Sequence, residues 1–338
     1  MLSLSPKITA VKEKASSRTV VIGSGTEATV YLGKAQYKQN KGGSKVQLIA
    51  LKTPSSSSFL DNLKKEAQIL SKFDHPNIVK AISCTDKTCS ETLFREAELG
   101  FTLPLEISTD GSLFDLIFNS KAPIPPTIAK TYFLQLMEGI EALHSRGVIH
   151  RDLKLENFLL FESGATVKIS DFGLSEVVLT DTFCSKDLQK SYSSTKLAGS
   201  LPYMSPECHI GRFSVSTDLF SLAVAGFIMV FGIPPFASAK STDKHYRYIS
   251  SGNMKEYVKI LLKSTKLTAD QIDYDFLELF FAMTHPSAEQ RPTLCEIKKS
   301  PWLKDAKLDD TEQACQYLAK QRPNRGTEFS NHLDCEET

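Results

Sequence analysis

Asp152, Asn157 and Asp171 stand where short apolar segments end in the middle of the chain. Polar side chains at the ends of buried strands can converge in a fold although they lie apart in the sequence. Two carboxylates and one amide oxygen, with no His or Cys cluster beside them, suit a hard cation such as Mg²⁺, which takes water and phosphate oxygens as its other ligands. The chemistry that these three residues predict is metal-assisted phosphoryl transfer.

The residues around them match two contiguous motifs. HRDLKLEN, from His150 to Asn157, and DFG, from Asp171, resemble the catalytic loop and the metal-binding motif of eukaryotic protein kinases. The resemblance implies that Asp152 accepts the proton of a substrate hydroxyl and that Lys154 neutralises the transferring γ-phosphoryl group of ATP. It makes Asn157 and Asp171 the ligands of Mg²⁺. The bland alternative is an Arg-Asp pair that solvates a loop, and eight residues that match in order argue against it.

A glycine turn lies upstream, between two expected strands of residues 18–46. Gly23 and Gly25 let backbone amides approach a phosphate without interference from a Cβ atom. The family has a third glycine where Ala28 stands and often an aromatic residue where Glu27 stands, so this turn departs from the pattern. An acid close to the triphosphate would weaken nucleotide affinity. The resemblance implies that ATP contacts Ile22, Gly23, Ser24, Gly25, Thr26, Glu27, Ala28 and Val30.

Lys52 ends the segment QLIALK, which resembles the third strand of the family's small lobe. The resemblance implies that Lys52 binds the α- and β-phosphates and pairs with Glu66, which lies on an expected helix with an apolar face. The alternative for Glu66 is an exposed place in the Lys64-Lys65-Glu66 run. For the base of ATP, the resemblance implies contacts with Ala50, Glu106, Ile107 and Leu159.

The segment that follows DFG is rich in serine and threonine and resembles the family's activation segment. Arg151 would pair with a phosphate there. Lys196 stands at the usual phosphorylated position. An upstream kinase or autophosphorylation would therefore use Thr195, Ser194 or Ser193, or else activation needs no phosphate, and the sequence leaves both open.

Further features of the large lobe follow from the resemblance. Arg291 is the expected ion-pair partner of Glu207 in the SPE motif, and Asp218 would cap the backbone of the catalytic loop. Ser200, together with Lys154, indicates specificity for Ser and Thr. The segment GSLPYMSPE and the closing PWL resemble calmodulin-dependent and checkpoint-type kinases.

The whole pattern predicts an α+β, two-lobed protein kinase fold. Residues 18–305 are expected to form the kinase domain, with a small antiparallel β lobe plus one helix (18–106) and a larger, mainly α lobe (107–305). Residues 1–17 are expected to be a flexible lead-in, and residues 306–338 an acidic polar tail.

The composition is typical of a soluble globular protein, with 338 residues, 41% hydrophobic and 23% charged. A formal net charge of +1 argues against a nucleic-acid partner. Seven cysteines without a CxxC pair, and no secretory segment, favour an intracellular location, cytoplasmic or nuclear. The apolar run from Leu219 to Ile233 is shorter than the ~20 residues that span a bilayer, so it predicts a core helix and no membrane insertion. We expect a monomer.

These features predict a serine/threonine protein kinase that transfers the γ-phosphoryl group of ATP, with Mg²⁺, to Ser or Thr hydroxyls of protein substrates. A pseudokinase scaffold, which binds nucleotide or partners without turnover, is the alternative that Glu27 and Ala28 raise. A small-molecule phosphotransferase is a third interpretation, which the long activation segment and the SPE anchor disfavour.

Overall fold

The chain divides into two units. The computed structural model describes residues 6–12, 18–38, 43–82, 94–96, 99–178, 191–194, 199–265 and 267–321. The strand unit consists of the described residues up to Thr109 together with Asp171–Gly173, and the helix unit consists of Asp110–Ser170 and the described residues from Leu174 onward. The first boundary lies three residues beyond the one expected from the sequence.

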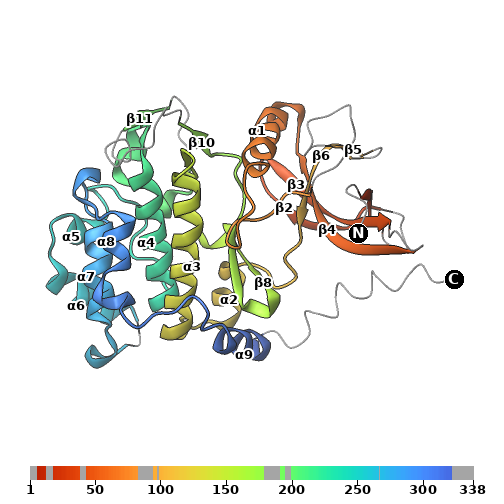
Figure 1. Cartoon of the computed structure of the whole chain (residues 1–338). Helices are drawn as coiled ribbons and strands as arrows, with labels where there is room; N and C mark the ends of the chain where they lie inside the picture. Colours follow the sequence, from red (N-terminus) through yellow and green to blue (C-terminus); the bar gives the residue numbers. More distant parts are fainter. Residues whose placement is uncertain are drawn as a thin grey trace. The chain divides into compact units, whose positions relative to one another are not determined.

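The strand unit is built on one antiparallel sheet with the order β1-β3-β4-β6-β5, and β2 pairs with β3 (Figure 1). Its inner strands carry runs of buried apolar residues, such as Leu48 to Leu51 in β4. The helix α1 (Leu60–Leu70) buries its apolar face, including Leu63 and Ala67. The strands are β1 (Lys7–Ala10), β2 (Val21–Ser24), β3 (Ala28–Lys38), β4 (Ser44–Pro54), β5 (Phe94–Glu96) and β6 (Gly100–Glu106).

The start of the chain differs from the prediction. Lys7–Ala10, expected to belong to a flexible lead-in, form β1 and pair with β3. Ile8 packs against the buried cluster of the sheet, and the amide of Val11 donates to the carbonyl of Leu32 at 2.9 Å. The prediction of a flexible lead-in was wrong for these residues. Hydrogen bonds to the edge of β3 stabilise the segment, which two apolar side chains alone could not do. Residues 1–5 and 13–17 lie outside the described residues.

The helix unit is mainly α-helical, and α3 and α4 pack side by side in it (Figure 1). Nearly every residue of α4 is buried, so the apolar run from Leu219 is the core helix that the sequence predicts. The helices are α2 (Leu113–Ser120), α3 (Pro126–His144), α4 (Val215–Phe231), α5 (Tyr246–Ser250), α6 (Met254–Ser264), α7 (Tyr274–Met283), α8 (Leu294–Lys298) and α9 (Glu312–Gln321). In the part of the chain that the structure describes, no helix has the length and hydropathy to cross a bilayer.

Three short ladders complete the helix unit. They pair β7 (Val148–Ile149) with β10 (Glu176–Val177), β8 (Phe158–Phe161) with β9 (Thr166–Ile169), and β11 (Tyr192–Ser193) with β12 (Arg212–Phe213). The catalytic-loop motif lies between β7 and β8, and β9 runs to the residue before Ser170. The mixed α and β content, with the sheet in one unit and the long helices in the other, confirms the predicted fold class.

The predicted polar tail also differs from the structure. α9 buries Ala314 and Leu318, and the loop before it is bound by α3, where Thr131 donates to the carbonyl of Lys307 at 3.1 Å. The helix unit therefore extends through Gln321. From the sequence, Ala314 to Leu318 could form a short helix, but the apolar period there is too weak to predict that it packs. Residues 322–338 of the expected tail lie outside the described residues.

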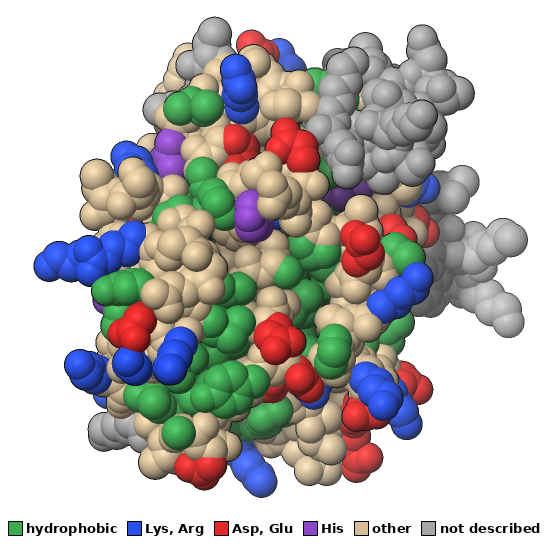
Figure 2. All heavy atoms as spheres, turned by 90° about the vertical axis from the view of Figure 1, so that its left-hand side faces the viewer, with side chains coloured by type: hydrophobic (Ala, Val, Ile, Leu, Met, Phe, Trp, Pro, Cys, Tyr) green, Lys and Arg blue, Asp and Glu red, His purple; other side chains and the backbone are tan. Residues whose placement is uncertain are grey.

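Figure 2 shows basic and acidic side chains scattered over one face of the molecule, with apolar side chains between them. On the described residues of that face, no continuous basic region forms. This distribution agrees with the formal net charge of +1.

Candidate active site

In the strand unit, Lys52 on β4 binds two carboxylates. Its Nζ donates to Oε2 of Glu66 at 2.6 Å and to Oδ1 of Asp171 at 2.7 Å. Glu66 is only 1% exposed, and its second oxygen, Oε1, accepts a hydrogen bond from the amide of Phe172 at 3.2 Å. The predicted pairing of Lys52 with Glu66 is therefore present, and the alternative of an exposed Glu66 is wrong.

The two carboxylates also fix the charge of Lys52. Burial alone would lower the pKa of Lys52, but the negative charges of Asp171 and Glu66 raise it well above the ordinary lysine value. Lys52 is therefore a permanent ammonium group, held by α1 and by the DFG motif. A cation in this position can bind phosphate oxygens without first taking up a proton.

The glycine turn joins β2 to β3. The amide of Gly25 donates to the carbonyl of Ala28 at 2.9 Å, which closes the turn. A Cβ atom added to Gly23 or Gly25 would make only ordinary contacts, at 3.7 Å, and neither glycine has a positive φ. The fold itself would therefore admit alanine at both positions, so local packing does not require glycine there.

The turn carries a contact that the sequence did not reveal. Nδ2 of Asn62, on α1, donates to Oε2 of Glu27 at 2.9 Å. The amide of Ser55 donates to the carbonyl of Glu27, also at 2.9 Å. Asn62 lies 35 positions from Glu27 and belongs to no motif, so only the fold brings the two together.

The residues predicted to contact ATP belong to both units. In the strand unit, Ala50 pairs with Leu32 on one side and with Leu105 on the other. Ile22 and Ile107 pack against the cluster that contains Leu32. The other predicted residues are also placed: Val30 pairs with Gly23 and Lys52, Ser24 lies at the end of β2, Thr26 is exposed in the turn, and Leu159 belongs to β8 of the helix unit.

Glu106 differs from its predicted role in one respect. Its amide donates to the carbonyl of Lys80 at 3.0 Å, and its side chain accepts from the amide of Lys80 at 2.8 Å. The amide is thus already bonded within the strand unit. Any hydrogen bond from the Glu106 amide to a base would have to replace one that the fold makes.

In the helix unit, Asp152 forms a closed network with Lys154 and Ser200. Nζ of Lys154 donates to Oδ2 of Asp152 at 2.7 Å and to Oγ of Ser200 at 2.9 Å, and Oγ of Ser200 donates to Oδ1 of Asp152 at 2.9 Å. The side chain of Asp152 is 7% exposed. Both oxygens of this carboxylate are therefore held in fixed directions.

Asn157 is oriented by the same residue. Its Nδ2 donates to the carbonyl of Asp152 at 2.8 Å. Because the amide nitrogen is used in this way, the side-chain oxygen of Asn157 can serve another ligand. An amide oxygen here and the carboxylate of Asp171 are the donor types that Mg²⁺ prefers, so the residues present fit that cation.

Asp218 binds the backbone of the catalytic loop, as the sequence predicts. Its two oxygens accept hydrogen bonds from the amides of His150 and Arg151, each at 2.9 Å. Nε2 of His144 lies 2.8 Å from the same carboxylate. Burial alone would raise the pKa of Asp218, but the hydrogen bond with His144 and the loop amides hold it below the ordinary aspartate value. Asp218 is therefore a buried carboxylate that fixes the backbone around Asp152.

Arg151 has partners that the sequence did not reveal. Its guanidinium lies over the ring of Phe213 at 4.3 Å, and Nη1 donates to Oε1 of Glu176 at 3.1 Å. Glu176 lies on β10, which pairs with β7 directly before His150. An acid on the strand that neighbours the loop was the signal available, but it lies outside the contiguous motifs. Of the predicted phosphorylation positions, Ser193 and Ser194 are described and Thr195 lies outside the described residues.

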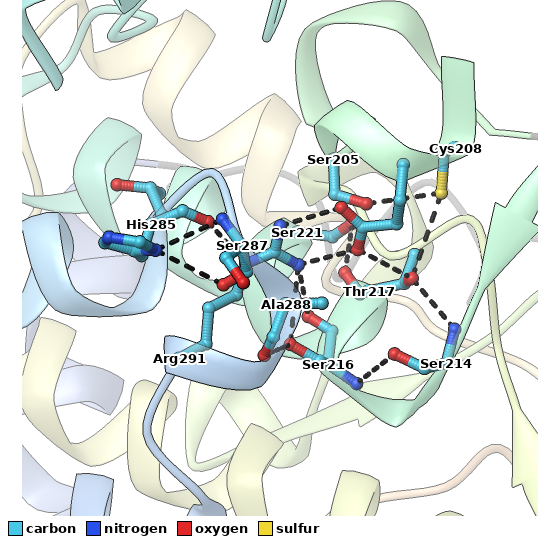
Figure 3. A network of polar contacts seen from close by, with 12 residues as sticks. Ser205, Cys208, Ser214, Ser216, Thr217, Ser221, His285, Ser287, Ala288 and Arg291 are labelled. Carbon is cyan, nitrogen blue, oxygen red and sulfur yellow. Dashed lines mark hydrogen bonds and ion pairs between the residues drawn. The ribbon is translucent and has the colours of Figure 1, made fainter. Parts of the chain in front are cut away.

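The predicted pair of Glu207 and Arg291 is present. Nη1 and Nη2 of Arg291 donate to the two oxygens of Glu207, both at 2.7 Å. Figure 3 shows Arg291 among Ser216, Ala288 and His285, and it also donates to the carbonyls of His285 and Ser216. Burial opposes ionisation of Glu207, but the hydrogen bonds from Arg291 lower its pKa. This pair anchors the segment that follows Ser200.

The predicted site residues thus form two sets. Lys52, Glu66, Asp171 and the glycine turn belong to the strand unit, and Asp152, Lys154, Asn157 and Leu159 belong to the helix unit. Ser170 and Asp171 are consecutive in the sequence, so the chain passes from the helix unit to the strand unit at this point. The first set can hold phosphate, the second can orient a hydroxyl group, and each offers one oxygen ligand for a cation.

One known protein family and several curated proteins are similar to this chain. Residues 17–303 match the protein kinase domain family. The chain is 28% identical over 284 residues to the SNF-related serine/threonine-protein kinase of Homo sapiens. The matched region is 83% of this chain and 32% of that protein. It is 34% identical over 208 residues to serine/threonine-protein kinase CHK1 of Mycosarcoma maydis. The matched region is 61% of this chain and 29% of that protein.

A third relative is the calcium and calcium/calmodulin-dependent serine/threonine-protein kinase of Pisum sativum. It is 31% identical over 242 residues, which are 70% of this chain and 40% of that protein. The chain therefore spans about a third of the length of these relatives.

Proposed function

Since this chain belongs to the protein kinase domain family, we propose that it transfers the γ-phosphoryl group of ATP to serine and threonine hydroxyls of protein substrates. The observation that carries the proposal is the network in which both oxygens of Asp152 are bound by Lys154 and Ser200. A carboxylate oriented in this way is suited to accept the proton of an incoming hydroxyl.

Each residue has a role in this reaction. Asp152 orients the substrate hydroxyl and accepts its proton, while Lys154 neutralises charge that develops on the transferring phosphoryl group. Lys52, kept charged by Glu66 and Asp171, binds the phosphates of ATP. Asp171 and the side-chain oxygen of Asn157 would hold Mg²⁺, which supplies neutralising charge on the phosphate oxygens when bound. Positioning and electrostatic stabilisation account for most of the rate.

Ser200 supports serine and threonine as acceptors. Its hydroxyl bridges Asp152 and Lys154, so the side chains that meet the acceptor form one rigid group. The three relatives are named serine/threonine-protein kinases, which supports the same acceptors for this chain.

The position of an activating phosphate is a finer part of the proposal, and Ser193 suits it best. Ser193 is exposed and lies opposite Arg212 in the β11–β12 ladder. Residues directly opposite in an antiparallel ladder point to the same face. A phosphate on Ser193 would therefore face a guanidinium, which favours it electrostatically.

A pseudokinase scaffold is the second candidate, and the departures at Glu27 and Ala28 are what favour it. These positions lie in the glycine turn of the strand unit, where an acid replaces the family's usual residue. The ion pairs of Lys52 and the intact network of Asp152 argue against a scaffold, since a protein that does not turn over substrate needs neither.

A radiolabelled ATP assay with purified protein and a set of Ser- and Thr-containing peptides distinguishes the two. We expect Asp152→Asn to reduce incorporation at least about 100-fold, because an amide keeps the size of the side chain but cannot take up the proton. Asp305→Asn, at an exposed position of the helix unit, is the matched control and should retain wild-type activity. If wild type incorporated no more label than Asp152→Asn, the scaffold would be the better interpretation. Transfer to small metabolites but to no peptide would instead indicate a small-molecule phosphotransferase.

A further inference from the structure

Glu27 is held in place by two hydrogen bonds within the strand unit. Its carbonyl accepts from the amide of Ser55, and its Oε2 accepts from Nδ2 of Asn62, both at 2.9 Å. Backbone and side chain are thus both tied down, one to the segment before α1 and the other to α1 itself. The carboxylate is therefore not free to turn away from the glycine turn.

The carboxylate of Glu27 lies beside the DFG motif. A Cβ atom built on Gly173 would be 3.4 Å from Oε2 of Glu27 and 3.5 Å from Oδ1 of Asp171. The two acidic side chains therefore flank the same small volume. Asp171 is the residue of the strand unit that is proposed to hold Mg²⁺, so Glu27 stands close to the place where phosphate charge would gather.

The charges around this volume are unequal. Lys52 is bound by Glu66 and Asp171, and Glu27 makes no ion pair with a lysine or arginine among the described residues. Asn62 and Glu66 lie one helical turn apart, so a single face of α1 holds both the ammonium of Lys52 and the carboxylate of Glu27. Glu27 is consequently an extra negative charge at a fixed place.

We propose that Glu27, held by Asn62, is a specificity-determining residue that lowers nucleotide affinity in proportion to the phosphate charge of the ligand. The inference rests on the proposed function, because it assumes that the strand unit binds ATP near Lys52 and Asp171. Its physical basis is Coulomb repulsion between a fixed carboxylate and phosphate oxygens, which grows with the charge of the ligand and weakens with added salt.

The test is a series of ligands that differ in charge. Dissociation constants for adenosine, ADP with Mg²⁺, ATP with Mg²⁺ and ATP without a metal are measured by isothermal titration calorimetry on wild type and Glu27→Gln. Glutamine keeps an oxygen for the amide of Asn62 and removes only the charge. We expect no change for adenosine, about twofold tighter binding of the Mg²⁺ complex of ADP, about threefold tighter binding of the Mg²⁺ complex of ATP and about tenfold tighter binding of metal-free ATP.

Two further variants separate charge from structure. Asp61→Asn removes one carboxylate from the neighbouring position of α1, where the side chain is 90% exposed, and should leave every affinity unchanged. Asn62→Ala releases the carboxylate of Glu27 from its position. In that background, Glu27→Gln should give a smaller gain for ATP than it gives in wild type, which a double-mutant cycle measures directly.

The outcomes distinguish this inference from the proposed function. An equal gain for adenosine and for ATP would overturn the charge effect and assign Glu27 a packing role. Unchanged affinities for all charged ligands would overturn the inference while the proposed function stands. If wild type and Glu27→Gln bound none of the nucleotides, the proposed function itself would be wrong, and the inference with it.

Discussion

Asp152 accepts hydrogen bonds from three side chains, and each donor acts differently on a phosphoryl transfer. Lys154 brings positive charge to the carboxylate, and Asn157 is oriented by the same contact so that its oxygen can serve a cation. Ser200 brings no charge, yet it bridges Asp152 and Lys154. Its contribution is therefore position alone, which makes it the residue where positioning can be measured apart from electrostatics.

We expect Ser200→Ala to lower kcat for peptide phosphorylation about tenfold, with little change in KM for ATP, because Asp152 loses the donor that fixes Oδ1. Ser200→Thr keeps the hydroxyl and should restore most of the activity. The measurement is steady-state kinetics of the three proteins on one peptide. Equal loss in the alanine and threonine variants would show that the site responds to packing at position 200 rather than to the hydroxyl.

The site contacts that could be predicted from the sequence are those that the family resemblance implies. The partners of Lys52, Glu207 and the catalytic-loop backbone were each expected, and each contact is present. The contacts of Glu27 with Asn62 and of Arg151 with Glu176 were not expected. In each of these pairs one partner lies outside every contiguous motif, and its side chain is brought in by an element whose position only the tertiary fold sets.

At the scale of elements, the ion pair of Glu207 and Arg291 joins segments that are 84 positions apart in the sequence. Glu207 lies in the first turn of the short helix Pro206–Ile210. Arg291 follows another short helix, Ala288–Gln290, and donates to a carbonyl in the first turn of α4. The Arg291 side chain is fully buried. Removing its partner would leave a buried charge uncompensated, which costs far more than losing an exposed pair.

We expect Glu207→Gln to lower the free energy of unfolding by about 3 kcal/mol at pH 7. The pKa of Glu207 is lowered in the folded protein, so the stability from its charge is present above the ordinary glutamate value and is lost as pH falls through the lower folded pKa. The difference between wild type and variant should therefore shrink below about pH 4. Urea unfolding followed by the fluorescence of Trp302, the single tryptophan, measures it within the helix unit.

Glu278→Gln, on the exposed side of α7, is the control for this experiment and should match wild type at pH 7. A difference between wild type and Glu207→Gln that stayed constant from neutral to acid pH would contradict the linkage. It would mean that the shape of the side chain, and not its charge, stabilises the segment.

The elements that could be predicted are those with a strong period or a long apolar run. α4 was expected as a core helix from the apolar run Leu219 to Ile233, and the observed helix covers most of that run. β1 and α9 were not expected as packed elements. Each contributes few buried apolar side chains, and each is held largely through hydrogen bonds or contacts to a neighbour that is distant in the sequence.

At the scale of the whole molecule, the chain leaves the strand unit after Thr109 and returns to it only for Asp171–Gly173 among the described residues. The last described helix, α9, packs within the helix unit. α9 packs on the short helix Glu162–Gly164, which joins β8 to β9, and Leu318 lies so close to Gly164 that a Cβ there would be 3.0 Å from it. The hairpin that begins directly after Asn157 is thus supported by a segment more than 150 positions later.

This packing makes the end of the chain part of the stability of the helix unit. Leu318 is 5% exposed, so Leu318→Ala removes buried methyl groups and leaves a cavity beside Gly164. We expect a loss of about 2–3 kcal/mol in the free energy of unfolding. Gln316→Ala also introduces alanine into α9, but at an exposed position. It should change the free energy of unfolding by no more than about 0.5 kcal/mol. Urea unfolding monitored at Trp302 compares the two variants with wild type, and equal stability of all three would show that α9 does not stabilise the unit on which it packs.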